Sequence, residues 1–136
     1  MDVLKWLARY GILFGVFLAI DMIWLVVVAR KFYARHLGFL MRDPVGLPAA
    51  LLFYLLFVGG ILFFVLAPAL ERNSLGYAAF AGALFGLVTY ATYDLTNLAT
   101  IKGWPLLVTI VDLGWGTGVS LAVSVIGFLL VRRWVP

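Results

Sequence analysis

The chain has 136 residues, of which 65% are hydrophobic and only 12% are charged. Soluble globular domains are about 45–50% apolar and about 25% charged, so most of this surface is expected to face lipid. The sequence has no cysteine and a single histidine, His36. This excludes disulfides, thiolate metal sites and cysteine nucleophiles, and it argues against histidine-rich metal or haem sites. The net charge of +4 is spread over the helix ends, which suits lipid phosphates better than nucleic acid.

Four apolar stretches are long enough to cross a bilayer, which takes about 20 residues. We expect spans over residues 4–29, 48–70, 75–101 and 105–131, forming an all-α membrane four-helix bundle within a single transmembrane domain, residues 1–136. The first stretch is too long for the apolar region of a signal peptide and no cleavage site follows, so we interpret it as a retained helix. Both termini then lie on one side.

We call the side with the termini face A and the opposite side face B. The segment 30–47 lies at face B, with apolar side chains on one helical face and cations on another. This pattern predicts a short helix in the membrane interface, and a solvated basic loop is an equal alternative. His36 is expected to be an interfacial residue rather than a metal ligand.

Tryptophans and cations occur at the predicted ends of the spans. Trp6, Trp104 and Trp134 are placed as an aromatic belt requires. The cations divide equally, so the positive-inside rule gives no orientation. Face A carries Lys5, Arg9, Arg72, Arg132 and Arg133, and face B carries Arg30, Lys31, Arg35, Arg42 and Lys102.

Three spans each contain an aspartate at a similar predicted depth. With a rise of about 1.5 Å per residue, Asp21 lies roughly 13 Å from face B, whereas Asp94 and Asp112 lie about 12 Å from it. Tyr54 lies roughly 9 Å deep on the same scale. A carboxylate at the centre of a span costs roughly 2.5–3.5 kcal/mol, so these acids indicate a functional site. Three ionised acids at one depth would repel, and at least one is expected to hold its proton.

The polar residues of the last two spans fall on single helical faces at about 100° per residue. In the third span the shared face comprises Thr89, Tyr90, Tyr93, Thr96, Asn97 and Thr100, with Asp94 at its edge. Gly82 and Gly86 form a notch for close helix approach on the same side. In the fourth span Thr109, Asp112, Gly116 and Ser120 align. We expect these faces to point into the bundle, although hydroxyl groups often only bond neighbouring helices.

A D-x-x-W spacing occurs twice, in Asp21–Trp24 and in Asp112–Trp115. In each case the tryptophan lies one helical turn from the acid and is placed to form a wall of a pocket. The first and fourth spans run in opposite directions, so the two tryptophans are expected on opposite sides of the acid layer. A chance match in a tryptophan-rich chain is an equal alternative.

Several short motifs together resemble a known family. They are the stretch TYDLTNLAT at residues 92–100, Trp104-Pro105, VDLGWG at residues 111–116 and D-x-x-WL in the first span. The combination resembles domain-of-unknown-function family 2177, a family of small bacterial membrane proteins, over nearly the whole chain. The resemblance implies four helices in the bacterial inner membrane and a signature at residues 93–97. It implies no catalytic role for any residue.

Our leading hypothesis is a protein that binds or carries a small amphiphilic or lipid-like molecule in an intramembrane pocket opening toward face B. The predicted ligand-binding residues are Asp21, Trp24, Tyr54, Tyr90, Tyr93, Asp94, Asn97, Asp112 and Trp115. Five cations are predicted to bind lipid headgroups at the mouth: Arg30, Lys31, Arg35, Arg42 and Lys102. The expected partners are membrane lipids and this ligand, with no nucleic acid, no assigned cofactor and no metal.

Three alternatives stay open. One is a membrane enzyme acting on a lipid or isoprenoid, in which carboxylates do acid–base work or the three aspartates hold a divalent ion. Another is proton-coupled transport by a titrating aspartate, which at this size would need a homo-oligomer. The last is a structural subunit of a larger membrane complex.

Overall fold

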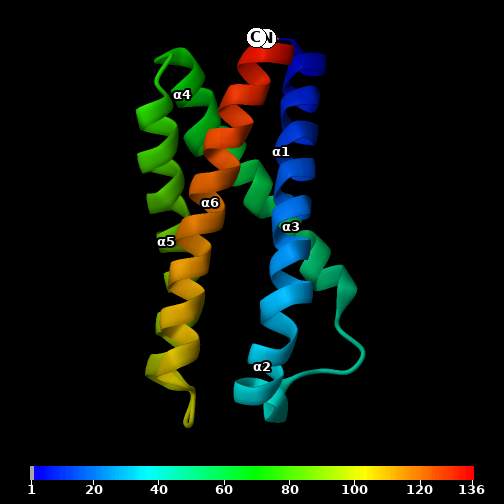
Figure 1. Cartoon of the computed structure of the whole chain (residues 1–136), viewed down its shortest axis with the longest axis vertical. Coiled ribbons are helices and arrows are strands. Elements are labelled where there is room, and N and C mark those ends of the chain that lie inside the picture. Colours follow the sequence, from blue (N-terminus) through cyan, green and yellow to red (C-terminus); the bar gives the residue numbers. More distant parts are fainter. Residues whose placement is uncertain (1) are drawn as a thin grey trace.

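The computed structural model describes residues 2–136, which form four long helical runs and no strand (Figure 1). The first run joins α1 (Val3–Trp24), the π-helical turn η1 (Leu25–Ala29), α2 (Arg30–Leu37) and the 3-10 turn η2 (Gly38–Leu40). The second joins α3 (Leu47–Gly60), the π-helical segment η3 (Ile61–Leu66) and α4 (Ala67–Glu71). The third is α5 (Leu75–Thr100), and the fourth is α6 (Leu106–Trp134). Each run is long and apolar enough to cross a membrane.

The first helical run is longer than the sequence suggested. We expected it to end at Ala29 and be followed by an interfacial helix or a loop, but a single run of 38 residues extends from Val3 to Leu40. The π turn joins its two parts, because the Arg30 N–H bonds the Leu25 carbonyl five residues back. Part of the segment that we assigned to the interface therefore belongs to the bundle.

Both ends of the chain lie at one end of the bundle, as expected (Figure 1). The Lys5 Nζ donates to the Pro136 carbonyl at 3.0 Å, and the Arg9 Nε donates to the Val135 carbonyl at 3.4 Å. These bonds hold the start of α1 against the end of α6. Face A is thus the end with the termini, and face B carries α2 and the turn before α6.

Helices α5 and α6 pack closely through small residues. A Cβ at Gly82 would lie 2.5 Å from the Ser124 Oγ, and one at Gly86 would lie 2.6 Å from the Ser120 Cβ. Such distances leave no room for a side chain on α5, so glycine is required for the helices to approach. The notch that the sequence predicted on this helix is confirmed.

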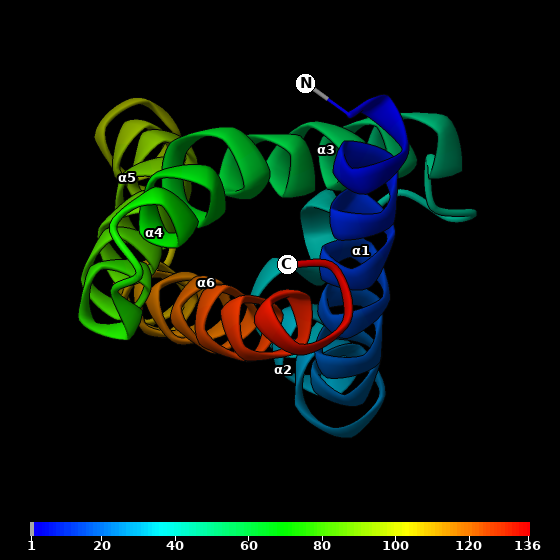
Figure 2. The ribbon, with the colours of Figure 1, turned by 90° about the horizontal axis from the view of Figure 1, so that it is seen from above.

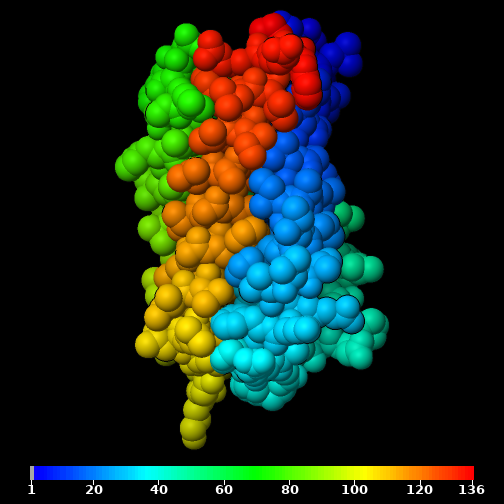
Figure 3. Space-filling view, viewed as in Figure 1, coloured from blue at the N-terminus to red at the C-terminus, as the bar shows by residue number. Residues whose placement is uncertain are grey.

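The apolar core lies mainly in the half of the bundle near face A. It contains Leu13 and Phe17 of α1. It also contains several residues between 57 and 69 of the second run and several between Val119 and Val131 of α6. Seen along the long axis, the second run crosses obliquely from the side of α1 to the side of α5 (Figure 2). The seam between α1 and α6 is filled by side chains on the face shown in Figure 3.

A smaller apolar cluster lies at face B and consists of Leu37, Trp104 and Val108. Trp104 is only 8% exposed, and its indole N–H donates to the Thr109 hydroxyl at 3.1 Å. We expected this tryptophan in a lipid-facing belt, and it instead packs inside the bundle. Trp134, at the other end of α6, is 63% exposed.

The threonines of α5 also differ from our expectation. Thr96 and Thr100 are exposed rather than directed into the bundle. The Thr100 hydroxyl donates to the Thr96 carbonyl at 2.7 Å, and the Thr92 hydroxyl donates to the Val88 carbonyl at the same distance. Because these hydroxyl groups are satisfied within their own helix, they can face lipid at little cost.

Candidate functional site

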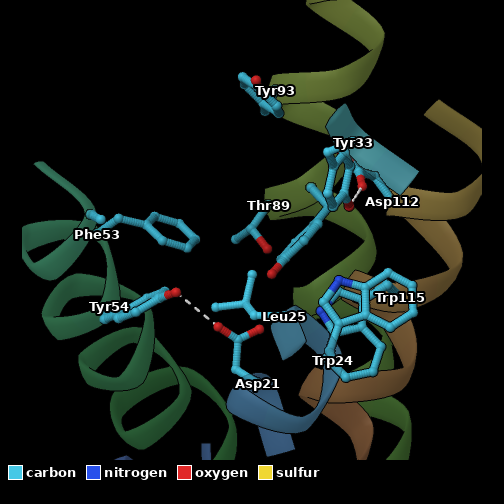
Figure 4. Close-up of a pocket in the computed structure, with 12 residues that line it drawn as sticks. Asp21, Trp24, Leu25, Tyr33, Phe53, Tyr54, Thr89, Tyr93, Asp112 and Trp115 are labelled. Atoms are coloured by element: carbon cyan, nitrogen blue, oxygen red, sulfur yellow. Dashed lines mark hydrogen bonds between the residues drawn. The ribbon is translucent and has the colours of Figure 1, made fainter. Parts of the chain in front are cut away.

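A cavity of about 540 Å³ lies inside the bundle, between all four helical runs (Figure 4). Its lining combines carboxyl groups, hydroxyl groups and aromatic rings in a mainly apolar wall. The lining residues are Asp21, Trp24, Leu25, Tyr33, Ala50, Phe53, Tyr54, Thr89, Tyr90, Tyr93, Asp112 and Trp115.

One end of the cavity is formed around Asp21. Its side chain is 5% exposed, so it faces the interior of the bundle rather than lipid. The Tyr54 hydroxyl of α3 donates to its Oδ2 at 2.8 Å. A donor from another helix therefore holds this carboxyl group in place.

The other end of the cavity is formed around Asp112, which is 6% exposed. The Tyr33 hydroxyl of α2 donates to its Oδ1. Asp94 of α5 is a neighbour of this carboxyl group and is 0% exposed. Neither oxygen of Asp94 has a hydrogen-bond partner among the described residues.

A proton held by Asp94 or Asp112 would allow these two neighbouring carboxyl groups to form a hydrogen bond. Two ionised carboxylates repel each other and offer no donor between them, whereas one proton gives a hydrogen bond. Asp112 is the member that reaches the cavity, and Asp94 is closed off behind it. The arrangement can store, accept or release a proton next to whatever occupies the cavity.

The two D-x-x-W motifs meet, but not as we predicted. Trp24 and Trp115 stack with ring centroids 4.3 Å apart and an angle of 7° between their planes. They therefore lie at one level, and Figure 4 shows Asp112 toward one end of the cavity and Asp21 toward the other. Each acid is three residues from its tryptophan on antiparallel helices, so the two acids differ by about 9 Å in height. The single acid layer that we predicted is wrong: Asp94 and Asp112 share a level, and Asp21 lies nearer face A.

Tyr33 was not among the predicted site residues, and the π turn explains why. It follows Asp21 by twelve residues, which in an uninterrupted α-helix would place it about 120° around the axis. A π turn absorbs one extra residue, so the two side chains lie roughly 20° apart. Tyr33 therefore faces the same cavity as Asp21. Only the Leu25–Ala29 turn makes this alignment, and the sequence contains no clear signal for it.

The cavity reaches the surface of the bundle between α3 and α5. Phe53 of α3 and Tyr93 of α5 both line it, yet they are 44% and 55% exposed. Toward face B, the cluster of Leu37, Trp104 and Val108 packs across the ends of α2 and α6. The exposed rim indicates that the cavity is accessible from the side of the bundle, and the opening toward face B stays a prediction.

Seven of the nine predicted ligand-binding residues line the cavity. The other two are Asp94, which is a neighbour of Asp112, and Asn97, which lies one helical turn after Tyr93 on α5. The predicted headgroup-binding cations do not line the cavity in the part of the chain that the structure describes. All five are exposed at face B: Arg30, Lys31, Arg35, Arg42 and Lys102.

The geometry also bears on the divalent-ion alternative. Within residues 2–136, no three histidine, cysteine, aspartate or glutamate side chains lie close enough together to hold a metal ion. Asp21 lies at a different level from Asp94 and Asp112, so the three aspartates do not form one ligand set.

These features define the class of the molecule, a membrane protein with four spanning helical runs and an internal cavity lined by aromatic rings and two carboxyl groups. Over residues 6–129 the chain matches the model of a family described as a predicted membrane protein, DUF2177. The chain therefore belongs to this family, whose activity is not assigned, and the resemblance drawn from its motifs is confirmed. No curated protein and no solved structure matches the chain.

Proposed function

We propose that this protein binds or carries a small amphiphilic, lipid-like molecule in its intramembrane cavity. The observation that carries the proposal is that Asp21 and Asp112 face one aromatic-lined cavity inside the spanning helices. The cavity volume of about 540 Å³ falls within the range of about 300–1,000 Å³ typical of ligand pockets. Acids inside spans are costly and are usually associated with binding or transport pathways.

The two kinds of lining suit the two parts of an amphiphile. Apolar side chains of Leu25, Ala50 and Phe53 lie in the wall on the side of the first and second runs. The carboxyl groups of Asp21 and Asp112 supply polar contacts deeper in the bundle. A molecule that enters sideways from the bilayer would thus keep its apolar part against apolar side chains while its polar part reaches the acids.

The setting of the protein is part of this proposal. We place it in the bacterial inner membrane, as the family resemblance implies, with surrounding lipids as partners. The five exposed cations of face B would contact lipid phosphates there, because juxtamembrane cations attract anionic headgroups. The cavity lies within one chain, so binding does not require a homo-oligomer, whereas carriage across the membrane would.

The test is mass spectrometry of the small molecules retained by protein purified from native membranes. In an Ala50→Phe variant the larger side chain would fill part of the cavity, and we expect the retained ligand to be lost. Ala99→Phe places the same side chain at an exposed position on α5 and is the matched control. If Ala50→Phe retains the same molecules in the same amounts as the wild type, the proposal is wrong.

A second candidate is a membrane enzyme that acts on a lipid or isoprenoid by acid–base chemistry. The Asp94–Asp112 pair favours it, because two carboxyl groups that share a proton can serve as acid and base. Incubation with a membrane lipid extract would separate the candidates. An enzyme changes the extract and loses this activity on Asp94→Asn substitution, whereas a binding protein leaves the extract unchanged.

A further inference from the structure

The only residues of the cavity lining that carry charge at neutral pH, among the described residues, are acidic. Its lining includes two carboxyl groups and no lysine, arginine or histidine in the part of the chain that the structure describes. The Tyr54 hydroxyl donates to Asp21, and the Tyr33 hydroxyl donates to Asp112. Both donors are neutral, and the neighbouring Asp94 brings a third carboxyl group rather than a cation.

A carboxylate buried in the bundle loses its hydration, and a hydroxyl that donates to it only partly offsets this cost. The ionised forms of Asp21 and Asp112 would therefore need a partner of opposite charge. No lysine, arginine or histidine among the described lining residues supplies one. A cationic ligand would supply the missing charge.

Aromatic rings surround the same space. Seven aromatic side chains line the cavity, contributed by all four helical runs: Trp24, Tyr33, Phe53, Tyr54, Tyr90, Tyr93 and Trp115. The face of such a ring attracts a cation, by about 2 kcal/mol when the cation is desolvated. A cavity with acids at two levels and rings between them is poorly suited to an anionic group and well suited to a weakly hydrated cation.

We propose that the ligand is a lipophilic organic cation, such as a protonated amine or quaternary ammonium, whose charge lies between Asp21 and Asp112. This inference rests on the proposed function and names its ligand class. Asp94 lies next to Asp112, and a proton on Asp94 would let it donate to the ionised Asp112. A neutral lipid of the same shape would leave both carboxyl groups without a counter-ion, and an anion would be repelled.

Two ions of the same shape and opposite charge provide the test. Tetraphenylphosphonium and tetraphenylborate would each be measured by equilibrium dialysis against the purified full-length protein in a neutral detergent. We expect saturable binding of the phosphonium at one site per chain and no saturable binding of the borate. This comparison uses the wild-type protein, so it does not depend on any variant folding.

Substitutions then locate the site. Asp21→Asn and Asp112→Asn should each weaken phosphonium binding about tenfold or more, because each removes one partner of a buried charge pair. Asp43→Asn removes a carboxylate from an exposed loop outside the cavity and should leave binding unchanged. Size-exclusion profiles would verify that each variant is folded. Equal binding of the two ions, or full phosphonium affinity in both cavity variants, would overturn the inference.

The failure of this inference can be distinguished from failure of the proposed function. If the phosphonium does not bind but Ala50→Phe still removes a molecule retained from native membranes, the cavity binds an amphiphile that is not a cation. If Ala50→Phe changes neither phosphonium binding nor the retained molecules, both proposals are wrong.

Discussion

The half of the bundle near face A and the half near face B are built from different side chains. Near face A, α5 approaches α6 through Gly82 and Gly86, and apolar side chains fill the remaining space. Toward face B, stacked tryptophans, tyrosines and acids border a cavity instead. Small residues let helices close together, and large rings that bond acids keep them apart. This difference shows that the cavity is determined by the residue types at these positions and is not a packing defect.

A glycine substitution in the close-packed half should have the largest effect on stability. A Cβ at Gly86 would meet the Gly116 carbonyl group and the Ser120 side chain, so Gly86→Ala must push α5 and α6 apart. Overpacking of this kind costs about 3 kcal/mol. We expect a large drop in the thermal midpoint of the detergent-solubilised protein, followed by circular dichroism.

Gly118→Ala is the matched control, since nothing lies within 4 Å of the Cβ that it adds. Alanine favours a helix over glycine by about 0.5–1 kcal/mol, so this variant should melt at or slightly above the wild-type temperature. Equal destabilisation by both substitutions would show that the close approach is not what stabilises this half.

A substitution in the cavity half should have an intermediate effect. Tyr33→Phe removes the hydroxyl that donates to Asp112 and leaves the ring in place. Loss of a hydrogen bond to a charged group costs about 2 kcal/mol. The thermal midpoint should fall by less than in Gly86→Ala.

Tyr77→Phe is the control, because Tyr77 lies on α5 outside the cavity, and it should leave the midpoint unchanged. An unchanged midpoint in Tyr33→Phe would contradict the assignment of α2 to the site.

The smallest effect is expected on the lipid-facing side of α5. Thr100→Val removes a hydroxyl that bonds only the Thr96 carbonyl of its own helix. The carbonyl keeps its helical hydrogen bonding, so stability should change by about 0.5 kcal/mol or less. A larger loss in the same melting assay would mean that this threonine contacts a partner helix.

The sequence predicted the four spanning helices well, because long apolar stretches leave few other arrangements. It also predicted that Asp21 and Asp112 face inward, since a carboxyl group on the lipid side is costly. It did not predict the relative heights of the helices along the axis of the bundle. The stacking of Trp24 on Trp115, which sets the heights of the acids, depends on contacts between helices that no single helix encodes.

The sequence also did not show which face of each helix points into the bundle. Tyr33 was assigned to the interface because the π turn before it cannot be recognised from Leu25–Ala29. Phe53 and Ala50 were missed because apolar residues in a purely apolar span carry no sign of which face is inside. Thr96 and Thr100 were placed inside because they are polar, although a threonine can bond its own helix and face lipid.

The position of the cavity near face B has a consequence for the two leaflets of the bilayer. A ligand that enters sideways, as proposed, would reach the cavity from the leaflet on that side. The half near face A contains the apolar core instead. The molecule is therefore asymmetric across the membrane, and the proposed ligand would be drawn from one monolayer.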